Sequence, residues 1–332
     1  MTDTLFLTSD EIDGLATPAD YVTRVADGYR QRGAGAPAEP RTALFGDEPP
    51  GMLTSYSAIL PDDGYMGGYS YSAGFGAGDA WFMTPLFDAD SGEPLALLDG
   101  ANMNPFKTGA TGAVAIDALA REDAETVGLI GSGAQARGQL RATATVRELA
   151  AVDVYSPTKS HREAFADEMT ETLGVDVTAV ESSAAAVADA DIVITATNAG
   201  EPVFDGEQLA PGTHVTAMGQ YNPTKRELDT TTIERSTYVP DLRDRATQDA
   251  GALLHAIDTG VVDESHIHAE LGDIVAGNAA GRTSNEEITV FDSGGTAIET
   301  VAAAGMLYER ACEQGLGSTI EFAPASDALT GK

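Results

Sequence analysis

A glycine-rich turn that reads VGLIGSGAQA is the clearest chemical signal in the sequence. Gly131 and Gly133 follow an apolar run, and Ala136 lies in a segment of helix-forming residues. In a strand–turn–helix, the first glycine permits a tight turn and the second lets the backbone approach a pyrophosphate, while a small third residue keeps helix and strand close. Because motif and context agree, we predict a dinucleotide site here in preference to a purely structural turn.

The end of the next expected strand indicates which dinucleotide is bound. A fold that prefers NAD usually ends this strand with an acid that holds the ribose 2′-hydroxyl. Here Asp153 lies too early, and the strand ends at Ser156, followed by Thr158, Lys159 and Arg162. Hydroxyls and cations suit a 2′-phosphate, which an acid would repel. We therefore predict that NADP is bound, with NAD as the alternative. In that alternative, Lys159 and Arg162 are ordinary solvated residues of a first helical turn.

A rare lysine marks a second candidate site. Lys107 lies in the apolar, glycine-flanked stretch DGANMNPFKTGA and is one of only four lysines in 332 residues. A stray surface lysine is disfavoured in so acidic a chain. We therefore interpret Lys107 as a functional cation.

The composition excludes several kinds of partner. A formal charge of −33, from 52 Asp and Glu against 19 Lys and Arg, repels nucleic acid and anionic membranes. The acids are spread through helical segments, which indicates a halophilic protein of a high-salt cytoplasm, with an ordinary acidic cytosolic enzyme as the alternative. Cys312 is the only cysteine, the N-terminus lacks a basic signal region, and no apolar run reaches the roughly 18 residues of a membrane span. We expect a cytoplasmic location.

The elements that must position these residues follow from periodicity. Residues 9–31 are typical of capped amphipathic helices. Short runs with turn signals between them predict a meandering, mostly antiparallel sheet over residues 52–60, 66–73, 80–88 and 94–99. After residue 108, strands alternate with helices, which indicates βαβ units on a parallel sheet. The last stretch, GGTAIETVAAAGMLYERACEQG, predicts a long helix with no strand after it.

This order predicts an α/β fold with two domains. A Rossmann-type dinucleotide-binding domain (113–299) would be inserted into a discontinuous α+β domain for substrate binding and dimerisation (1–112 plus 300–332). A metal site is not expected, because His266 and His268 are two residues apart and would point to different faces of a helix.

With these elements placed, the chain resembles the ornithine cyclodeaminase/μ-crystallin family, which also holds archaeal alanine dehydrogenases and cyclic ketimine reductases. The resemblance runs nearly from end to end, through EPRTAL, LLDGANMNPFKTGATGAVA, IGSGAQAR, VITATNAGEPVF, HVTAMGQYNPTKRELD and IHAELGDIVAGNAAGRTSNEEITVFDSGG. It implies a homodimer and a pocket for a small 2-amino, 2-imino or 2-keto acid. Arg41 and Lys107 would hold the carboxylate, and hydride would move between C2 and the nicotinamide C4. The resemblance also implies further cofactor contacts from Ala134, Gln135, Thr195, Thr197, Met218, Gly219, Ser293 and Gly294.

Four positions depart from the family pattern. Lys107 fills the slot of an arginine, so one point charge replaces a flat fork. Ser70, beside Tyr69, falls where the family has a lysine, and Tyr221 replaces the catalytic aspartate of cyclodeaminases. Asp292 replaces the lysine of F-K-S-x-G.

Three hypotheses follow from this pattern. The first is an NAD(P)H-dependent oxidoreductase that acts at C2 of a small acid, as a ketimine reductase or an alanine-dehydrogenase-like enzyme, with Lys107 and Tyr221 as catalytic residues and Tyr69 or water as other proton sources. The second is an ornithine cyclodeaminase with bound NAD, which the missing aspartate disfavours. The third is an NADP-binding, μ-crystallin-like protein with little catalysis.

Overall fold

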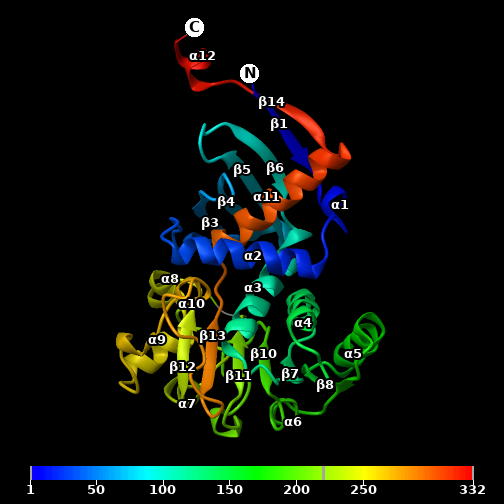
Figure 1. Ribbon diagram of the computed structural model, residues 1–332, viewed down its shortest axis with the longest axis vertical. Coiled ribbons are helices and arrows are strands. Elements are labelled where there is room, and N and C mark those ends of the chain that lie inside the picture. Colours follow the sequence, from blue (N-terminus) through cyan, green and yellow to red (C-terminus); the bar gives the residue numbers. More distant parts are fainter. Residues whose placement is uncertain (1, 219–220, 331–332) are drawn as a thin grey trace. The chain divides into compact units, whose positions relative to one another are not determined.

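The structure, a computed structural model, describes residues 2–218 and 221–330 (Figure 1). It divides into two compact units, which we call the meander unit (1–107 and 296–332) and the parallel unit (108–295). The predicted boundaries, after residues 112 and 299, lie slightly further along the chain. Helix α3 (Met103–Leu119) crosses the first boundary without a break, so no local signal marks the division.

Within the described residues, the meander unit contains a seven-stranded sheet in the order β14-β1-β6-β5-β4-β3-β2. Neighbouring strands are antiparallel except for the parallel pair β1 and β6. The strands are β1 (Thr2–Leu7), β2 (Thr42–Asp47), β3 (Pro50–Leu60), β4 (Tyr65–Gly74), β5 (Asp79–Asp88), β6 (Pro94–Asp99) and β14 (Ser318–Phe322). The predicted meander is therefore present. The prediction that no strand follows the last helix is wrong, because β14 pairs with β1 at the sheet edge.

In the meander unit, helices α1 (Ser9–Ile12), α2 (Pro18–Gly33) and α11 (Ala297–Gln314) begin at threonine caps. The unit also contains the terminal helix α12 (Ala325–Thr330) and the short 3₁₀ turn η1 (Phe75–Ala77). Thr17 caps α2 with Asp20, and Thr296 caps α11 with Glu299. Helix α11 packs against α2, β3 and β4. The approach is close, since a Cβ added to Gly305 would lie 2.4 Å from the Tyr65 ring.

The parallel unit contains, over its described residues, seven parallel strands in the order β12-β13-β11-β10-β7-β8-β9. The strands are β7 (Thr126–Ile130), β8 (Ala151–Tyr155), β9 (Val177–Ala179), β10 (Ile192–Thr195), β11 (His214–Ala217), β12 (Ser236–Pro240) and β13 (Ile288–Asp292). The strand order reverses between β7 and β10. Parallel sheets of this kind bind dinucleotides at such a reversal, at the carboxyl ends of the strands.

Helices cover both faces of the parallel sheet. They are α4 (Ala134–Val146), α5 (Lys159–Leu173), α6 (Ser183–Val187), α7 (Thr230–Glu234), α8 (Arg243–Asp249), α9 (Gly251–Asp258) and α10 (Leu271–Val275), with η2 (Gly206–Gln208) and η3 (Glu264–His266). Ile192 and Ile194 of β10 join one buried apolar cluster, whereas Val193 joins the other. A strand buried on both faces has consecutive apolar residues, as Ile192–Ile194 are.

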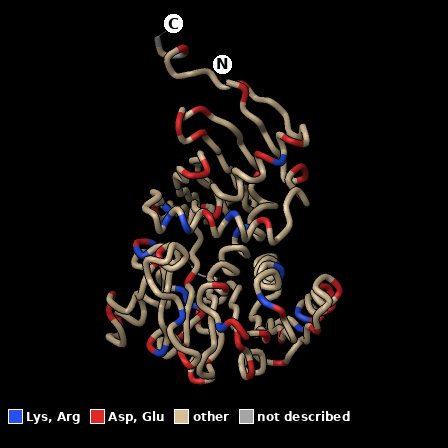
Figure 2. Tube along the Cα trace, in the orientation of Figure 1, with Lys and Arg blue, Asp and Glu red and all other residues tan. Residues whose placement is uncertain are grey.

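Acidic side chains occur throughout both units (Figure 2). Among the described residues, no helix is long and apolar enough to cross a membrane. No group of three potential metal-binding side chains occurs in residues 2–218 and 221–330 either. His266 and His268 instead face backbone carbonyls, with Nε2 atoms 2.7 Å from Ile233 O and 2.8 Å from Ala280 O.

Candidate dinucleotide and substrate sites

The glycine turn between β7 and α4 has the geometry that a pyrophosphate requires. Gly131 has φ of 127°, and a Cβ there would lie 2.3 Å from the carbonyl oxygen of Ala196. Gly133, the N-cap of α4, has φ of −85°, and an added Cβ would meet nothing within 4 Å. Ala136 is fully buried against the sheet. The turn therefore has an open space in front of Gly133 that a side chain would fill.

Two buried polar atoms at the carboxyl ends of the strands also fit a bound dinucleotide. Gln135, in the first turn of α4, and Ser293, directly after β13, have side-chain oxygens without a hydrogen-bond partner in the described part of the chain. Such atoms normally find a partner, and a polar cofactor would supply one. The backbone amide of Met218 donates to Thr195 O at 3.0 Å. The remaining predicted contact at this edge, Gly219, lies outside the described residues.

Glu227 organises the end of β10, and the sequence analysis missed it. Its carboxylate accepts hydrogen bonds from the Thr195 hydroxyl at 2.9 Å and from the Thr197 amide at 2.7 Å. Glu227 lies in the KREL run, far along the chain from β10, and is 3% exposed. The two threonines predicted as cofactor contacts are therefore fixed by a carboxylate.

The residues that were predicted to contact the ribose lie at and after the end of β8. The Ser156 hydroxyl is 3.0 Å from that of Ser132, in the glycine turn. Arg162 is buried and donates to Ser156 O at 3.1 Å and to Glu181 at 2.8 Å. It is thus neither a solvated residue nor a free cation. Thr158 and Lys159 are exposed, and the Lys159 ammonium lies 3.7 Å from Glu163.

The meander unit holds two buried cations among aromatic rings. The Lys107 ammonium lies 5.0 Å from the ring centre of Tyr69, and the Arg41 guanidinium lies 5.4 Å from that of Tyr56. Arg41 also donates to the Tyr71 hydroxyl at 3.4 Å. Lys107 is 2% exposed and Arg41 4%. We call Arg41, Lys107, Tyr56, Tyr69, Tyr71 and Phe82 the cation–tyrosine cluster.

A carboxylate from α11 balances this cluster. The Lys107 ammonium lies 3.5 Å from Glu299, which is fully buried and also accepts from the Thr296 amide at 2.7 Å. Burial lowers the pKa of Lys107, Glu299 opposes that shift, and the nearby charge of Arg41 adds to it. Burial raises the pKa of Tyr69, whose hydroxyl donates to Gly100 O at 3.3 Å, so Tyr69 holds its proton.

Two other predicted site residues are Ser70 and Tyr221. Ser70 lies between Tyr69 and Tyr71 on β4, so its side chain points to the opposite face of the sheet. There it pairs in register with Met83, which is 55% exposed. Ser70 therefore faces away from the cation–tyrosine cluster. Tyr221 belongs to the parallel unit and is 40% exposed.

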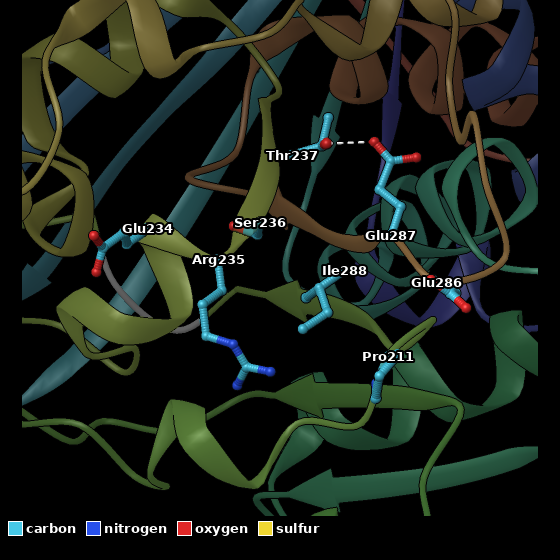
Figure 3. Close-up of a pocket in the computed structure, with 8 residues that line it drawn as sticks. All are labelled: Pro211, Glu234, Arg235, Ser236, Thr237, Glu286, Glu287 and Ile288. Atoms are coloured by element: carbon cyan, nitrogen blue, oxygen red, sulfur yellow. Dashed lines mark hydrogen bonds between the residues drawn. The ribbon is translucent and has the colours of Figure 1, made fainter.

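A cavity of about 410 Å³ opens at the end of the parallel sheet opposite to the glycine turn (Figure 3). It lies at the amino ends of β12 and β13, where Thr237 donates to Glu287 and Glu234 and Glu286 also line the wall. Sheets of this type bind their ligands at the carboxyl ends. This cavity is therefore not the dinucleotide site.

A parallel sheet with a glycine turn after its first strand, in a chain that also has an α+β unit, is typical of a dinucleotide-dependent enzyme. Residues 4–315 match the ornithine cyclodeaminase/mu-crystallin family, and the chain belongs to that family.

Its relatives include reductases of imino acids. The chain is 40% identical over 238 residues to a Delta(1)-pyrroline-2-carboxylate reductase of Bacillus cereus, covering 71% of this chain and 73% of that protein. It superposes on the Thermococcus litoralis Delta(1)-pyrroline-2-carboxylate reductase in complex with NADH and L-proline with a TM-score of 0.91, at 34% identity over 96% of this chain and 100% of that one. An archaeal alanine dehydrogenase dimer with bound NAD gives a TM-score of 0.90 at 31% identity, over 97% and 100%.

Proposed function

We propose that this protein is an NAD(P)H-dependent reductase of a cyclic 2-imino acid of the Δ1-pyrroline-2-carboxylate type. The observation that carries the proposal is the cation–tyrosine cluster, in which two buried cations lie among aromatic rings. One carboxylate suits the two cations, and the rings suit a flat, largely apolar ring. Glu299 already offsets the charge of Lys107, so the cluster suits a substrate with one carboxylate better than a substrate with two.

The residues divide the work as follows. Gly131, Gly133 and the first turn of α4 would hold the pyrophosphate, and a bound reduced nicotinamide would supply the hydride that C2 of the imine gains. Arg41 would hold the substrate carboxylate. Lys107 would supply the second charge and the proton that the imine nitrogen gains, since burial moves its pKa down from the usual lysine value. The product is the corresponding cyclic amino acid. Positioning of the substrate supplies much of the rate.

A panel of substrates tests this function. The rate of NADPH oxidation is measured with Δ1-pyrroline-2-carboxylate, with iminosuccinate, and with pyruvate plus ammonium, in concentrated KCl. We expect the highest kcat/KM for the cyclic imine. A higher value for pyruvate plus ammonium would assign an alanine dehydrogenase instead. Ammonia and proline formed from ornithine with catalytic NAD⁺ would assign a cyclodeaminase, and tight NADPH binding without turnover would assign a binding protein.

We infer further that NADP(H) is preferred over NAD(H). No acid ends β8, and the exposed Lys159 and Thr158 are available to a 2′-phosphate. Lys159→Glu should lower the affinity for NADPH, measured by fluorescence titration, and leave that for NADH nearly unchanged. Lys225→Glu, which changes another lysine of the parallel unit, is the control. Equal affinities of the unaltered protein for the two cofactors would contradict the preference.

We also infer a homodimer that is adapted to a high-salt cytoplasm. Leu44, Leu53 and Trp81 lie in one row of the meander sheet, in register through Ser72, and are 65%, 47% and 53% exposed. A second copy would cover this row. Trp81→Glu should give a monomer in sedimentation experiments. The acidic surface predicts that the melting temperature rises between about 0.2 M and about 2 M KCl as repulsion is screened.

A further inference from the structure

A fully buried arginine lies beside the carboxyl end of β13, among three aspartates. Arg245 Nε donates to Asp241 at 2.8 Å, and its Nη2 lies 2.7 Å from the Asp292 carboxylate. Its Nη1 lies 3.4 Å from Asp249. We call these four residues the Arg245 network. The run RDRATQD has the composition of an ordinary charged helix start, but the structure places its second arginine, Arg245, in the core.

The network fixes the turn that follows β13. The second oxygen of Asp241 accepts hydrogen bonds from the amides of Gly294 at 2.8 Å and Gly295 at 3.0 Å. Arg245 Nη2 also donates to the carbonyl of Asp292 at 2.8 Å. The arginine packs directly on the turn, since a Cβ added to Gly294 would lie 2.7 Å from Arg245 Nε. Three charge-assisted contacts therefore determine the path of the backbone on both sides of Ser293.

Ser293 is the residue that this arrangement presents. Its amide donates to Ala217 O at 2.9 Å, which ties it to the end of β11. Its hydroxyl is buried and has no hydrogen-bond partner within residues 2–218 and 221–330. The glycine turn follows β7, and the residues predicted to contact the ribose follow β8, so this side of the sheet would hold the adenosine half of a dinucleotide. The residues after β10, β11 and β13, on the other side of the reversal in strand order, would then hold the nicotinamide half.

We propose that Arg245 is a positioning residue for the nicotinamide half of the cofactor. It acts through Asp241 and Asp292, and it holds the Ser293 hydroxyl where a polar group of the nicotinamide can bond to it. An arginine suits this task, because a guanidinium has five N–H donors. It can contact Asp241, Asp249, and both the backbone carbonyl and the side-chain carboxylate of Asp292 at once, whereas an ammonium cannot. The proposal rests on the dinucleotide site described above.

This role is tested with two ligands, one that carries the nicotinamide and one that lacks it. Isothermal titration compares NADP⁺ with 2′-phospho-ADP-ribose, which lacks the nicotinamide, on the unaltered protein and on Arg245→Lys. Lysine keeps the charge and loses the fork. We expect the affinity for NADP⁺ to fall about tenfold, as for one lost charge-assisted hydrogen bond, and the affinity for the truncated ligand to change less than about twofold.

Asp241→Asn tests the contact between Arg245 and the turn after β13, because Asp241 accepts from both. Asparagine keeps the shape of the side chain, so this variant remains informative if the arginine variant does not fold. We expect the same selective loss. Arg282→Lys is the matched control, because Arg282 is a half-buried arginine that donates to Leu119 O and to Thr289 near the amino end of β13. It should leave the ratio of the two affinities unchanged.

The outcomes separate this inference from the proposed function. Equal losses for both ligands in Arg245→Lys and Asp241→Asn would mean a purely structural network, and unchanged binding of both ligands would mean that the network does not reach the site; either result overturns the inference. Failure of the unaltered protein to bind either ligand would instead overturn the dinucleotide site itself.

Discussion

The ammonium nitrogen of Lys107 lies 3.5 Å from a carboxylate oxygen of Glu299, and neither side chain is more than 2% exposed. One residue comes from α3 and the other from the first turn of α11, where Glu299 also completes the Thr296 cap. The pair therefore joins a candidate substrate-binding cation to the start of a core helix.

Removal of the Lys107 charge should have two separable effects. Lys107→Met leaves the Glu299 carboxylate buried without its cation, which costs about 3 kcal/mol of unfolding free energy. The double variant with Glu299→Gln should recover part of that stability in denaturant titrations. It should not recover substrate binding, because the charge for the carboxylate is still missing. Recovery of kcat/KM together with stability would show that Lys107 is only structural.

Arg41 should determine the strength of substrate binding. Arg41→Lys keeps one charge but loses the fork and the stacking on Tyr56, so we expect KM for the imine to rise about tenfold with a smaller change in kcat. Steady-state kinetics measure both constants. Arg30→Lys, an exposed arginine of α2 paired with Asp27, is the control and should behave as the unaltered protein. An unchanged KM in Arg41→Lys would remove Arg41 from the site.

The two glycines of the dinucleotide turn should respond differently to alanine. Gly131→Ala places a Cβ 2.3 Å from Ala196 O at a positive φ, so the variant should be destabilised by more than about 2 kcal/mol. Gly133→Ala meets no protein atom within 4 Å and should keep its melting temperature, yet bind NADPH at least about tenfold more weakly, because the Cβ occupies the approach to the pyrophosphate. Full NADPH affinity in Gly133→Ala would place the cofactor elsewhere.

Acid should destabilise the parallel unit through His214. This ring is fully buried between the hydroxyls of Thr289, at 2.9 Å, and Thr216, at 3.0 Å, and burial lowers its pKa to about 3. The unfolded chain takes up a proton below about pH 6.5 and the folded chain does not until about pH 3. The contribution to stability is therefore intact above pH 6.5 and is lost progressively as the pH falls towards 3, by about 1.4 kcal/mol per unit.

Urea titrations at several pH values between these limits measure that loss. His214→Gln should be less stable at neutral pH. Its unfolding free energy should fall less steeply as the pH is lowered, because the slope contributed by one bound proton, about 1.4 kcal/mol per pH unit, is absent. The comparison of slopes removes the contribution of the many carboxylates, which both proteins share. Parallel curves would contradict the assignment to His214.

The sequence by itself determined the local features. The glycine turn, the helix caps at Thr17 and Thr296 and the alternation of apolar strands with helices depend on neighbours within a few residues, so the Rossmann-type fold and the meander could be predicted from them. The rarity of lysine also drew attention to Lys107, which the structure places in the core.

Only the tertiary structure decided which side chains meet. Side chains around Ser70 alternate between the two faces of the sheet. The pairing of β4 with β3 and β5 determines that Tyr69 and Tyr71 lie on the buried face. Strand β14 exists because β1 offers it an edge. Glu299 lies far along the chain from Lys107, Glu227 from Thr195, and Arg245 from the turn that follows β13. Burial and charge pairing of this kind depend on contacts across the fold, which no local pattern in the sequence records.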